Sequence, residues 1–285
     1  MAIPANIPAM QELLIEPGRA EKNYWRDLWR YRELFYFLAW RDILVRYKQT
    51  VIGVAWAVIR PLLTSFVLVF VFNKIGKLPP PEGVPYFLFV LAANLPWQFF
   101  STSMSEASNS LIGNANLISK VYFPRLVVPA GAVITSFVDF LITLGLLALT
   151  MVFLRFPPGW QIVTLPLFML LAVGASFGIG LWLSALNVEY RDFRYIVPFI
   201  VQFGMYISPV GFSSADVAAR GQVIYSIYSL NPMVGVIEGF RWSLLAGKTP
   251  LDMQAVLTSV IVVILLLASG VWYFRKMERT FADVI

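Results

Sequence analysis

The sequence has no cysteine and no histidine, and only 13% of its residues are charged. The missing cysteine excludes disulfides and thiolate chemistry, and the missing histidine excludes metal sites that depend on imidazole. It also removes the commonest general base, which disfavours most hydrolase and transferase mechanisms. A soluble chain normally carries about a quarter charged residues, so the composition points away from an ordinary soluble domain.

Hydrophobic residues are in excess, at 59% of the chain, and they fall in long blocks. A helix of about 20 apolar residues matches the thickness of the hydrocarbon core of a bilayer. Backbone groups in that layer must be hydrogen-bonded internally, which leaves helices or closed barrels. The short alternating strands typical of a membrane barrel are absent from the sequence. The sequence therefore predicts an all-α integral membrane protein.

Six apolar segments are long enough to be predicted as transmembrane helices of a single domain covering residues 49–285. They are about 51–72, 84–105, 126–154, 162–186, 195–211 and 254–274. Residues 106–125 form a polar connection between the second and third of them. The prediction is thus a bundle of six spans.

Residues 213–250, called the gate segment below, are only moderately apolar. We expect two short re-entrant helices here, dipping into the membrane from outside. Asn231 followed by Pro232 is typical of a helix start, with Asn as the N-cap and Pro at the first helical position. Glu238 and Arg241 would then pair three residues apart on that helix.

The chain before the first span divides into two predicted parts. Residues 1–20 form a polar extension without the apolar core of a signal peptide. Residues 21–48 have the pattern of an amphipathic helix in which Trp25 and Trp29 alternate with Arg26 and Arg30. Aromatic and basic side chains together suit the cytoplasmic headgroup layer, and a solvated helix is the alternative.

Lysine and arginine are unevenly distributed between the predicted loops. They concentrate in 21–48, 120–125 and 275–279 and are sparser in the loops on the other side, such as 73–83. Because cationic loops stay in the cytoplasm, both termini are predicted to be cytoplasmic, in a bacterial inner membrane.

Two ionisable residues, Arg60 and Asp139, fall inside predicted spans. Such residues are functional candidates because an unpaired charge in a bilayer is costly. Arg60 suits an anionic headgroup or a pyrophosphate at the cytoplasmic opening, and snorkelling or an internal ion pair explains it equally well. For Asp139 a buried structural contact is the favoured interpretation.

Aromatic residues make up 15% of the chain, and many lie within the predicted spans. Phe199, Phe203 and Tyr206 follow helical spacing and share one face of the fifth span, and Phe66 and Phe70 do so in the first. Packing or lipid contact explains each ring alone. As a set, rings along a conduit would offer flat surfaces for sugar rings to slide across.

Four stretches of the sequence carry a resemblance to a known family. They are RDILVRYKQTVIGVAWAVIRPLL (41–63), NANLISKVYFPRLVVP (114–129), NVEYRDFRYIVPFIVQFGMYISPV (187–210) and LNPMVGVIEGFRWSLL (230–245). In order and spacing the chain, over about 30–280, resembles the membrane subunit of type-2 ABC exporters. The resemblance is to the branch that exports polysaccharides such as O antigens, capsules and teichoic acids.

The resemblance implies a partner that supplies the energy. Residues 114–125, called the coupling segment below, would dock on a separate ATPase subunit that binds ATP and Mg²⁺, so this chain needs no cofactor and no catalytic or metal-binding residue. The matching positions are Asn116, Leu117, Ile118, Lys120, Phe123, Pro124 and Arg125, with Glu189, Tyr190, Arg191 and Asp192 in a second cytoplasmic loop. The N-terminal amphipathic helix would contact the same ATPase.

The resemblance also implies a homodimer with two ATPase subunits and a pore at the interface between the two copies. The pore would be lined by Arg60, Phe66, Phe70, Phe199, Phe203 and Tyr206. The external gate would include Tyr225, Tyr228, Asn231, Pro232, Glu238 and Arg241. The cargo would be an undecaprenyl-diphosphate-linked glycan, most simply O antigen, and nucleic acid is not expected as a partner.

Three alternatives remain open from the sequence. The first is an exporter of drugs, lipids, ions or teichoic acid with the same architecture. The second is an integral-membrane glycosyl- or acyltransferase, although such enzymes usually need clustered carboxylates or a histidine. The third is a passive channel, which would work without an ATPase.

Overall fold

The computed structural model of the chain describes residues 24–48 and 54–281, and every regular element in these ranges is a helix. The all-α prediction is therefore confirmed for this part of the chain. The predicted polar extension, residues 1–20, lies outside the described residues. So do the first residues of the predicted interface helix and of the first span, 21–23 and 51–53.

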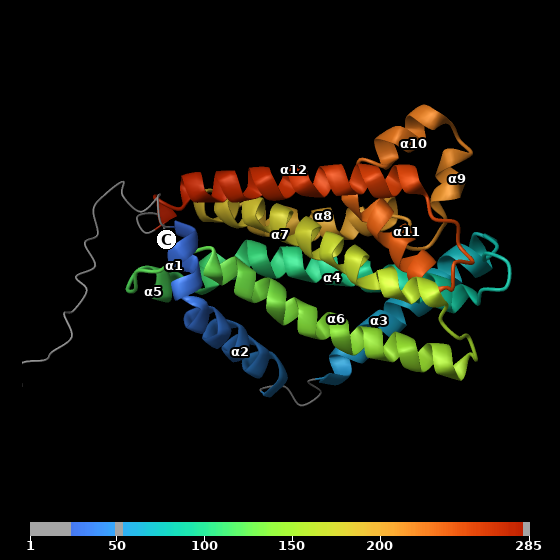
Figure 1. The fold of residues 1–285 in the computed structure, drawn as a ribbon, viewed down its shortest axis with the longest axis horizontal. Helices are drawn as coiled ribbons and strands as arrows, with labels where there is room; N and C mark the ends of the chain where they lie inside the picture. The colour runs from blue at the N-terminus through green and yellow to red at the C-terminus, as the bar shows by residue number, and fades with distance from the viewer. Residues whose placement is uncertain (1–23, 49–53, 282–285) are drawn as a thin grey trace, which may run out of the picture.

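Four long helices lie side by side along the long axis of the molecule (Figure 1). They are α4 (Tyr86–Gly113), α6 (Val127–Phe153), α7 (Leu165–Glu189) and α12 (Met253–Met277). The helices α1 (Tyr24–Arg30) and α5 (Ala115–Ile118) lie at the end where α12 finishes, which we call the coupling end. The helices α9 (Ser214–Ala218) and α10 (Gln222–Tyr228) lie at the opposite end, which we call the gate end.

Four helical stretches of the described chain are long and apolar enough to cross a membrane. They are Ala55–Ile75, Val127–Phe153, Trp160–Glu189 and Met253–Met277. The first joins α3 (Val54–Val69) to the π-helical turn η2 (Phe70–Ile75), and the third joins the 3-10 turn η3 (Trp160–Thr164) to α7. Thus the first, third, fourth and sixth predicted spans each have a matching candidate. The fifth corresponds to α8 (Phe193–Ile207), which is apolar but shorter.

The second predicted span corresponds to α4, which is not among the four candidates because it carries many polar residues. Asn94 donates to the Ser65 hydroxyl at 3.1 Å, and Asn187 of α7 donates to the carbonyl of Ser108 at 3.1 Å. The helix α4 packs chiefly against α6 and α7, and its Asn94 and Ser103 side chains bond to α3 and α7. These polar residues lower the mean hydropathy of α4 below that of the four candidate spans. The prediction that 106–113 is connecting chain is wrong, because α4 continues to Gly113.

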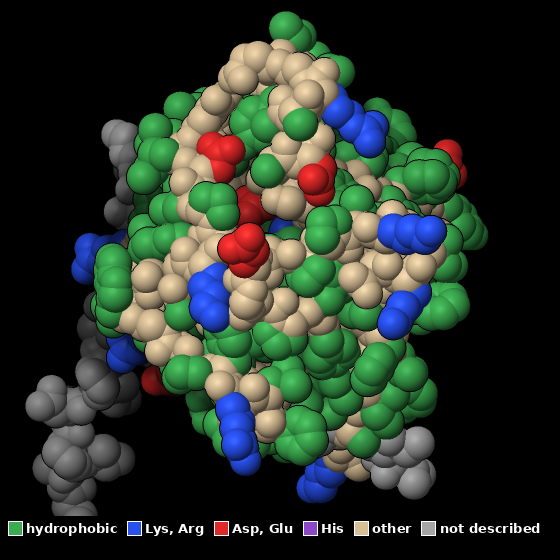
Figure 2. Space-filling view, turned by 90° about the vertical axis from the view of Figure 1, so that its right-hand side faces the viewer, with side chains coloured by type: hydrophobic (Ala, Val, Ile, Leu, Met, Phe, Trp, Pro, Cys, Tyr) green, Lys and Arg blue, Asp and Glu red, His purple; other side chains and the backbone are tan. Residues whose placement is uncertain are grey.

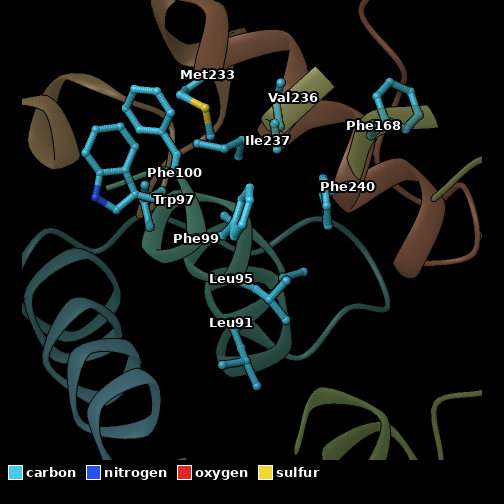
Figure 3. Packing of buried hydrophobic residues seen from close by; sticks show 14 of the residues in the cluster. Leu91, Leu95, Trp97, Phe99, Phe100, Phe168, Met233, Val236, Ile237 and Phe240 are labelled. Carbon is cyan, nitrogen blue, oxygen red and sulfur yellow. The ribbon is translucent and has the colours of Figure 1, made fainter. Parts of the chain in front are cut away.

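The main hydrophobic core lies where α4 meets α6, α7 and α11 (Pro232–Leu244). Aromatic rings join these helices in series: Phe99 and Phe140 have centroids 5.5 Å apart, and Phe140 and Phe240 6.0 Å. Figure 3 shows Leu91, Leu95 and Phe99 of α4 in this packing beside α11. A second cluster at the coupling end gathers Leu111, Ile118, Phe123, Phe274 and Phe281.

The contact between α7 and α12 depends on glycine. A Cβ atom added to Gly178 would lie 2.9 Å from the backbone of Leu266, and one added to Gly270 would lie 2.5 Å from the carbonyl oxygen of Gly178. The two backbones therefore approach more closely than any side chain would allow. Small residues play this role in membrane helix pairs, where dispersion contacts drive association.

The N-terminal helical region is divided, which corrects the prediction of one helix over 21–48. It forms α1 and then α2 (Arg32–Lys48), with a turn at Tyr31. The helix α2 packs along α6, as Figure 1 shows. On α2, Leu38 and Ala39 are buried, while Tyr36, Phe37 and Trp40 are exposed.

The gate segment contains three helices where two were predicted. The extra break lies at Gly221, whose φ of +134° separates α9 from α10 in a conformation that favours glycine. The predicted start of α11 is confirmed: the Asn231 side chain accepts a hydrogen bond from the backbone N–H of Met233 at 3.0 Å, and Pro232 opens the helix.

Candidate functional site

The coupling segment presents a polar tip and is anchored on either side by buried residues. Asn116, Lys120 and Tyr122 are exposed, whereas Ile118 and Phe123 are only 4% exposed and belong to the coupling-end cluster. The sequence-predicted residues of this segment therefore divide into an exposed group and an anchoring group. Val121 and Tyr122, both about half exposed, were not among the predicted residues although they lie within the same motif.

The end of the coupling segment is tied to the end of α12. The backbone N–H of Arg125 donates to the Glu278 carboxylate at 2.7 Å, and the Arg125 guanidinium donates to the carbonyl of Glu278. Burial raises the pKa of the Glu278 carboxyl above its usual range, and the hydrogen bond from Arg125 opposes that rise. Movement of the coupling segment is thereby linked directly to α12.

The N-terminal helices join the same junction. The guanidinium of Arg275 lies over the ring of Tyr24 at 4.5 Å from the centroid. Arg41 of α2 donates to the Asn114 side chain at 2.8 Å, and Asn114 is the N-cap residue of α5. The loop is therefore bonded directly to α2 and to the end of α12, and α12 contacts α1 in turn.

The second predicted loop follows α7. Glu189, Tyr190, Arg191 and Asp192 are all exposed, as a contact surface requires. Tyr190 donates its backbone N–H to the carbonyl of Leu186 at 2.7 Å and ends the helix. These residues form the connection from α7 to α8 and make no ion pair with one another within the described ranges.

The predicted gate residues are mainly internal. Arg241 is fully buried, and its guanidinium donates to the carbonyls of Val210 and Phe212, each at 3.0 Å. It also lies 3.6 Å from the ring centroid of Phe89 and 3.4 Å from the Glu238 carboxylate, which confirms the predicted pair. Burial of a cation is tolerated here because its donors are satisfied.

The neighbouring gate residues continue this internal network. Glu238 accepts from the backbone N–H of Ser214 at 3.2 Å, and Asn231 donates to the Ser208 hydroxyl at 2.9 Å. Tyr225 is buried, and its hydroxyl donates a hydrogen bond to the Asp252 carboxylate. Burial raises the pKa of the Tyr228 hydroxyl above its usual range. These contacts fix α9 and α11 to the end of α8. Figure 2 shows the gate end, where acidic and basic side chains are scattered among apolar ones.

The predicted channel residues are all exposed. Phe66 and Phe70 come from α3 and η2, and Phe199, Phe203 and Tyr206 come from α8; each ring is roughly half exposed or more. The helices α3 and α8 both pack against α4. On α8 the rings of Phe199 and Phe203 have centroids 4.2 Å apart, whereas Phe66 of α3 lies 4.8 Å from Phe87 of α4, which is outside the predicted set.

A pocket of about 420 Å³ lies between the end of α2 and the helices α3, α4 and α6. Arg60 lines it, and so does Asp139, which accepts a hydrogen bond from Arg46 at 2.6 Å and another from the Tyr47 hydroxyl. Arg46 also pairs with Glu106. The structural contact expected for Asp139 is therefore present, and its partners lie more than 90 residues away in the sequence.

Arg60 differs from the other charged residues of this pocket. Across 24–48 and 54–281 it makes no ion pair and no hydrogen bond through its side chain, and it is exposed. Arg46, Glu106 and Trp56 are pocket residues that the sequence analysis missed. A signal was available for two of them, because Arg46 and Glu106 are ionisable residues next to the ends of predicted spans.

Comparison with known proteins gives one family and several close relatives. The family described as ABC-2 type transporter matches residues 33–245. An "O-antigen export system permease protein RfbA" of Myxococcus xanthus is 30% identical over 265 residues, covering 91% of this chain and 98% of the relative. Two proteins of the same description from Klebsiella pneumoniae are 27% and 28% identical, each covering 86% of this chain and 92% of its own length.

Proposed function

The chain belongs to the ABC-2 type transporter family, and from that premise we propose that it is the permease subunit of an ATP-driven exporter of lipid-linked polysaccharide. O antigen is the first candidate cargo. The observation that carries this proposal is the match to three O-antigen export permeases over nearly the whole of both chains. The exporter would act in the bacterial inner membrane, with both termini of this chain in the cytoplasm.

The proposed transporter contains two copies of this chain and two copies of an ATPase subunit that binds ATP and Mg²⁺. The exposed tip of the coupling segment and the loop 189–192 would receive the ATPase. The support is geometric: the tip is exposed, while the two ends of the segment, Asn114 and Arg125, are bonded to Arg41 and Glu278. A docking loop needs both properties, because a loose loop would absorb the motion that the ATPase delivers.

We further propose that α4 and α8 cross the membrane together with the four candidate spans. The central position of α4 accounts for its polar residues, and α8 is apolar along most of its length. The helix α1 and the end of α12 lie at the same end of the bundle (Figure 1), as an even number of crossings requires. The exposed apolar residues Val223, Ile224 and Ile227 of α10 support re-entry of the gate segment into the membrane.

The conduit for the glycan is proposed to lie between two copies, lined by the exposed rings of α3 and α8. Rings that are exposed in one copy need a partner, and a sugar polymer matches flat apolar faces without fixed hydrogen bonds. Phe203→Ala combined with Tyr206→Ala should slow export and narrow the range of chain lengths exported. Unchanged export rate and chain-length distribution would contradict this part of the proposal.

The function itself is tested in a strain that lacks the chain. We expect undecaprenyl-linked glycan to accumulate on the cytoplasmic side and surface glycan to disappear, and the wild-type chain to restore both. A matched control is the same strain carrying the chain together with an ATPase subunit that cannot hydrolyse ATP. Normal surface glycan in the absence of this chain would overturn the proposed function.

A further inference from the structure

The pocket between α2, α3, α4 and α6 combines charge with an apolar floor. Its charged residues are Arg46, Arg60, Glu106 and Asp139, so its formal charges balance. Leu95, Phe99 and Phe140, which are buried, line it as well. A ligand that suits both parts has an anionic head and an apolar tail.

The depth of the pocket determines which anion can reach it. Asp139 lies near the middle of α6, roughly 18 Å along the helix from Val127 at 1.5 Å per residue. In a bilayer an ionised group at such a depth is stabilised only when it is paired. Arg46 pairs with both Glu106 and Asp139, whereas Arg60 makes no such contact with any described residue. Moving a lipid headgroup from the interface to this depth is costly unless cations meet it, and Arg60 and Arg46 are the cations that the pocket supplies.

We propose that this pocket binds the phosphate headgroup of a lipid, with Arg60 as the resident cation and Arg46 as a second cation released by Glu106 and Asp139 when the phosphate enters. The two carboxylates bond to Arg46 and neutralise the charge that two neighbouring arginines would otherwise leave uncompensated. The identity of the lipid rests on the proposed function: an export substrate would bring a polyprenyl diphosphate, whereas a resident phospholipid would bring a single phosphate.

The same arginine connects the pocket with the coupling segment. Arg46 and Arg41 lie on α2, and Arg41 donates to Asn114 at 2.8 Å at the start of the coupling segment. A phosphate that takes Arg46 from its carboxylates therefore changes the restraint on the last turns of α2, and Arg41, five residues earlier on the same helix, bonds to the loop proposed to receive the ATPase. Occupancy of the pocket would in this way reach the coupling end.

The experiment uses the transporter purified with its ATPase partner and measures binding of geranylgeranyl diphosphate by native mass spectrometry. Arg60→Gln should weaken binding by about tenfold or more, because a charge-assisted contact is lost. Glu106→Gln should strengthen it several-fold, because the pocket gains a net positive charge and Arg46 loses a competing partner. Lys74→Gln, which removes an exposed cation at the gate end, should leave binding unchanged.

Arg60→Gln should weaken binding of the probe and Glu106→Gln should strengthen it. These opposite effects distinguish a binding role of the pocket from a purely structural one. Arg60→Lys keeps the charge and should retain most of the binding, which controls for misfolding. Equal binding by wild type and Arg60→Gln, or weaker binding by Glu106→Gln, would overturn the proposal. Displacement of the probe by phosphatidylglycerol vesicles would support a resident phospholipid, and resistance to them would support a diphosphate cargo. If the probe binds as expected but the deletion strain still exports glycan, the proposed function fails and the pocket assignment stands.

Discussion

At the gate end, Glu238 and Arg241 are buried and bond to backbone groups of the chain around 210–214, whereas at the coupling end Lys120, Glu189 and Arg191 are exposed. Both sets were candidates for function, and both lie in segments between long helices. The difference indicates that Glu238 and Arg241 hold the backbone of the gate end. At the coupling end Arg125 and Glu278 hold the loop. Lys120, Glu189 and Arg191 on the surface of that end are left available for another molecule. Substitutions at the two ends should therefore differ in what they damage.

The largest expected effect on stability comes from Arg241→Met. It leaves the Glu238 carboxylate buried without its cation and the carbonyls of Val210 and Phe212 without their donor. Breaking a buried pair in this way costs about 3–5 kcal/mol in the free energy of unfolding. Thermal unfolding of the purified protein measures it, with the exposed Arg220→Met of the same segment as the control. An equal loss of unfolding free energy in Arg241→Met and Arg220→Met would show that the buried arginine stabilises the gate end no more than an exposed one does.

A smaller effect is expected from adding one methyl group at each end. A Cβ atom at Gly235 would lie 2.5 Å from the backbone oxygen of Ala255, whereas at Gly113, at the end of α4, no atom lies within 4 Å. Gly235→Ala should cost about 1–3 kcal/mol through overpacking. Gly113→Ala should be neutral or slightly stabilising. If the unfolding temperatures of both variants shift alike, the gate end is not the more tightly packed of the two.

The sequence predicted the all-helical architecture and the start of α11 because these depend on local patterns: apolar blocks and an Asn-Pro pair. It failed where long-range pairing decides. Nothing in the local sequence indicates that Arg46 would pair with Asp139, or that Tyr225, predicted as a residue of the external gate, would bond to Asp252. The second span was predicted to end near residue 105, whereas α4 continues to Gly113. The cause is the same, since hydropathy cannot distinguish a polar residue packed against another helix from one in a loop.

The Glu278 carboxyl should give stability a pH dependence at the coupling end. Because burial raises its pKa, the folded state binds the proton more tightly than the unfolded state does. Stability from this group is complete below the unfolded pKa, near 4.5, and is lost as the pH rises through the raised folded value. Glu278→Gln should therefore flatten the fall of the unfolding temperature over that range, and the exposed Glu82→Gln should not. Identical pH profiles for wild type and Glu278→Gln would exclude this role.

The smallest effect on stability is expected from the tip of the coupling segment. Lys120→Ala combined with Tyr122→Ala alters exposed side chains, so the free energy of unfolding should change by no more than about 0.5 kcal/mol per substitution. Export of glycan should nevertheless fall strongly, because the altered side chains are those proposed to touch the ATPase. Thermal unfolding and surface glycan measured on the same variant separate the two effects. Full export from the double variant would show that the tip is not needed.

The central proposal is that a separate ATPase docks on the coupling end of this chain. The direct measurement is recovery of that ATPase when the tagged chain is purified from native membranes under gentle extraction and its bound proteins are quantified by mass spectrometry. Wild type should carry one ATPase per chain, the Lys120→Ala, Tyr122→Ala variant should lose it, and Arg220→Met at the gate end should keep it. Recovery of the wild-type chain without any ATPase, or equal recovery with all three, would contradict the account.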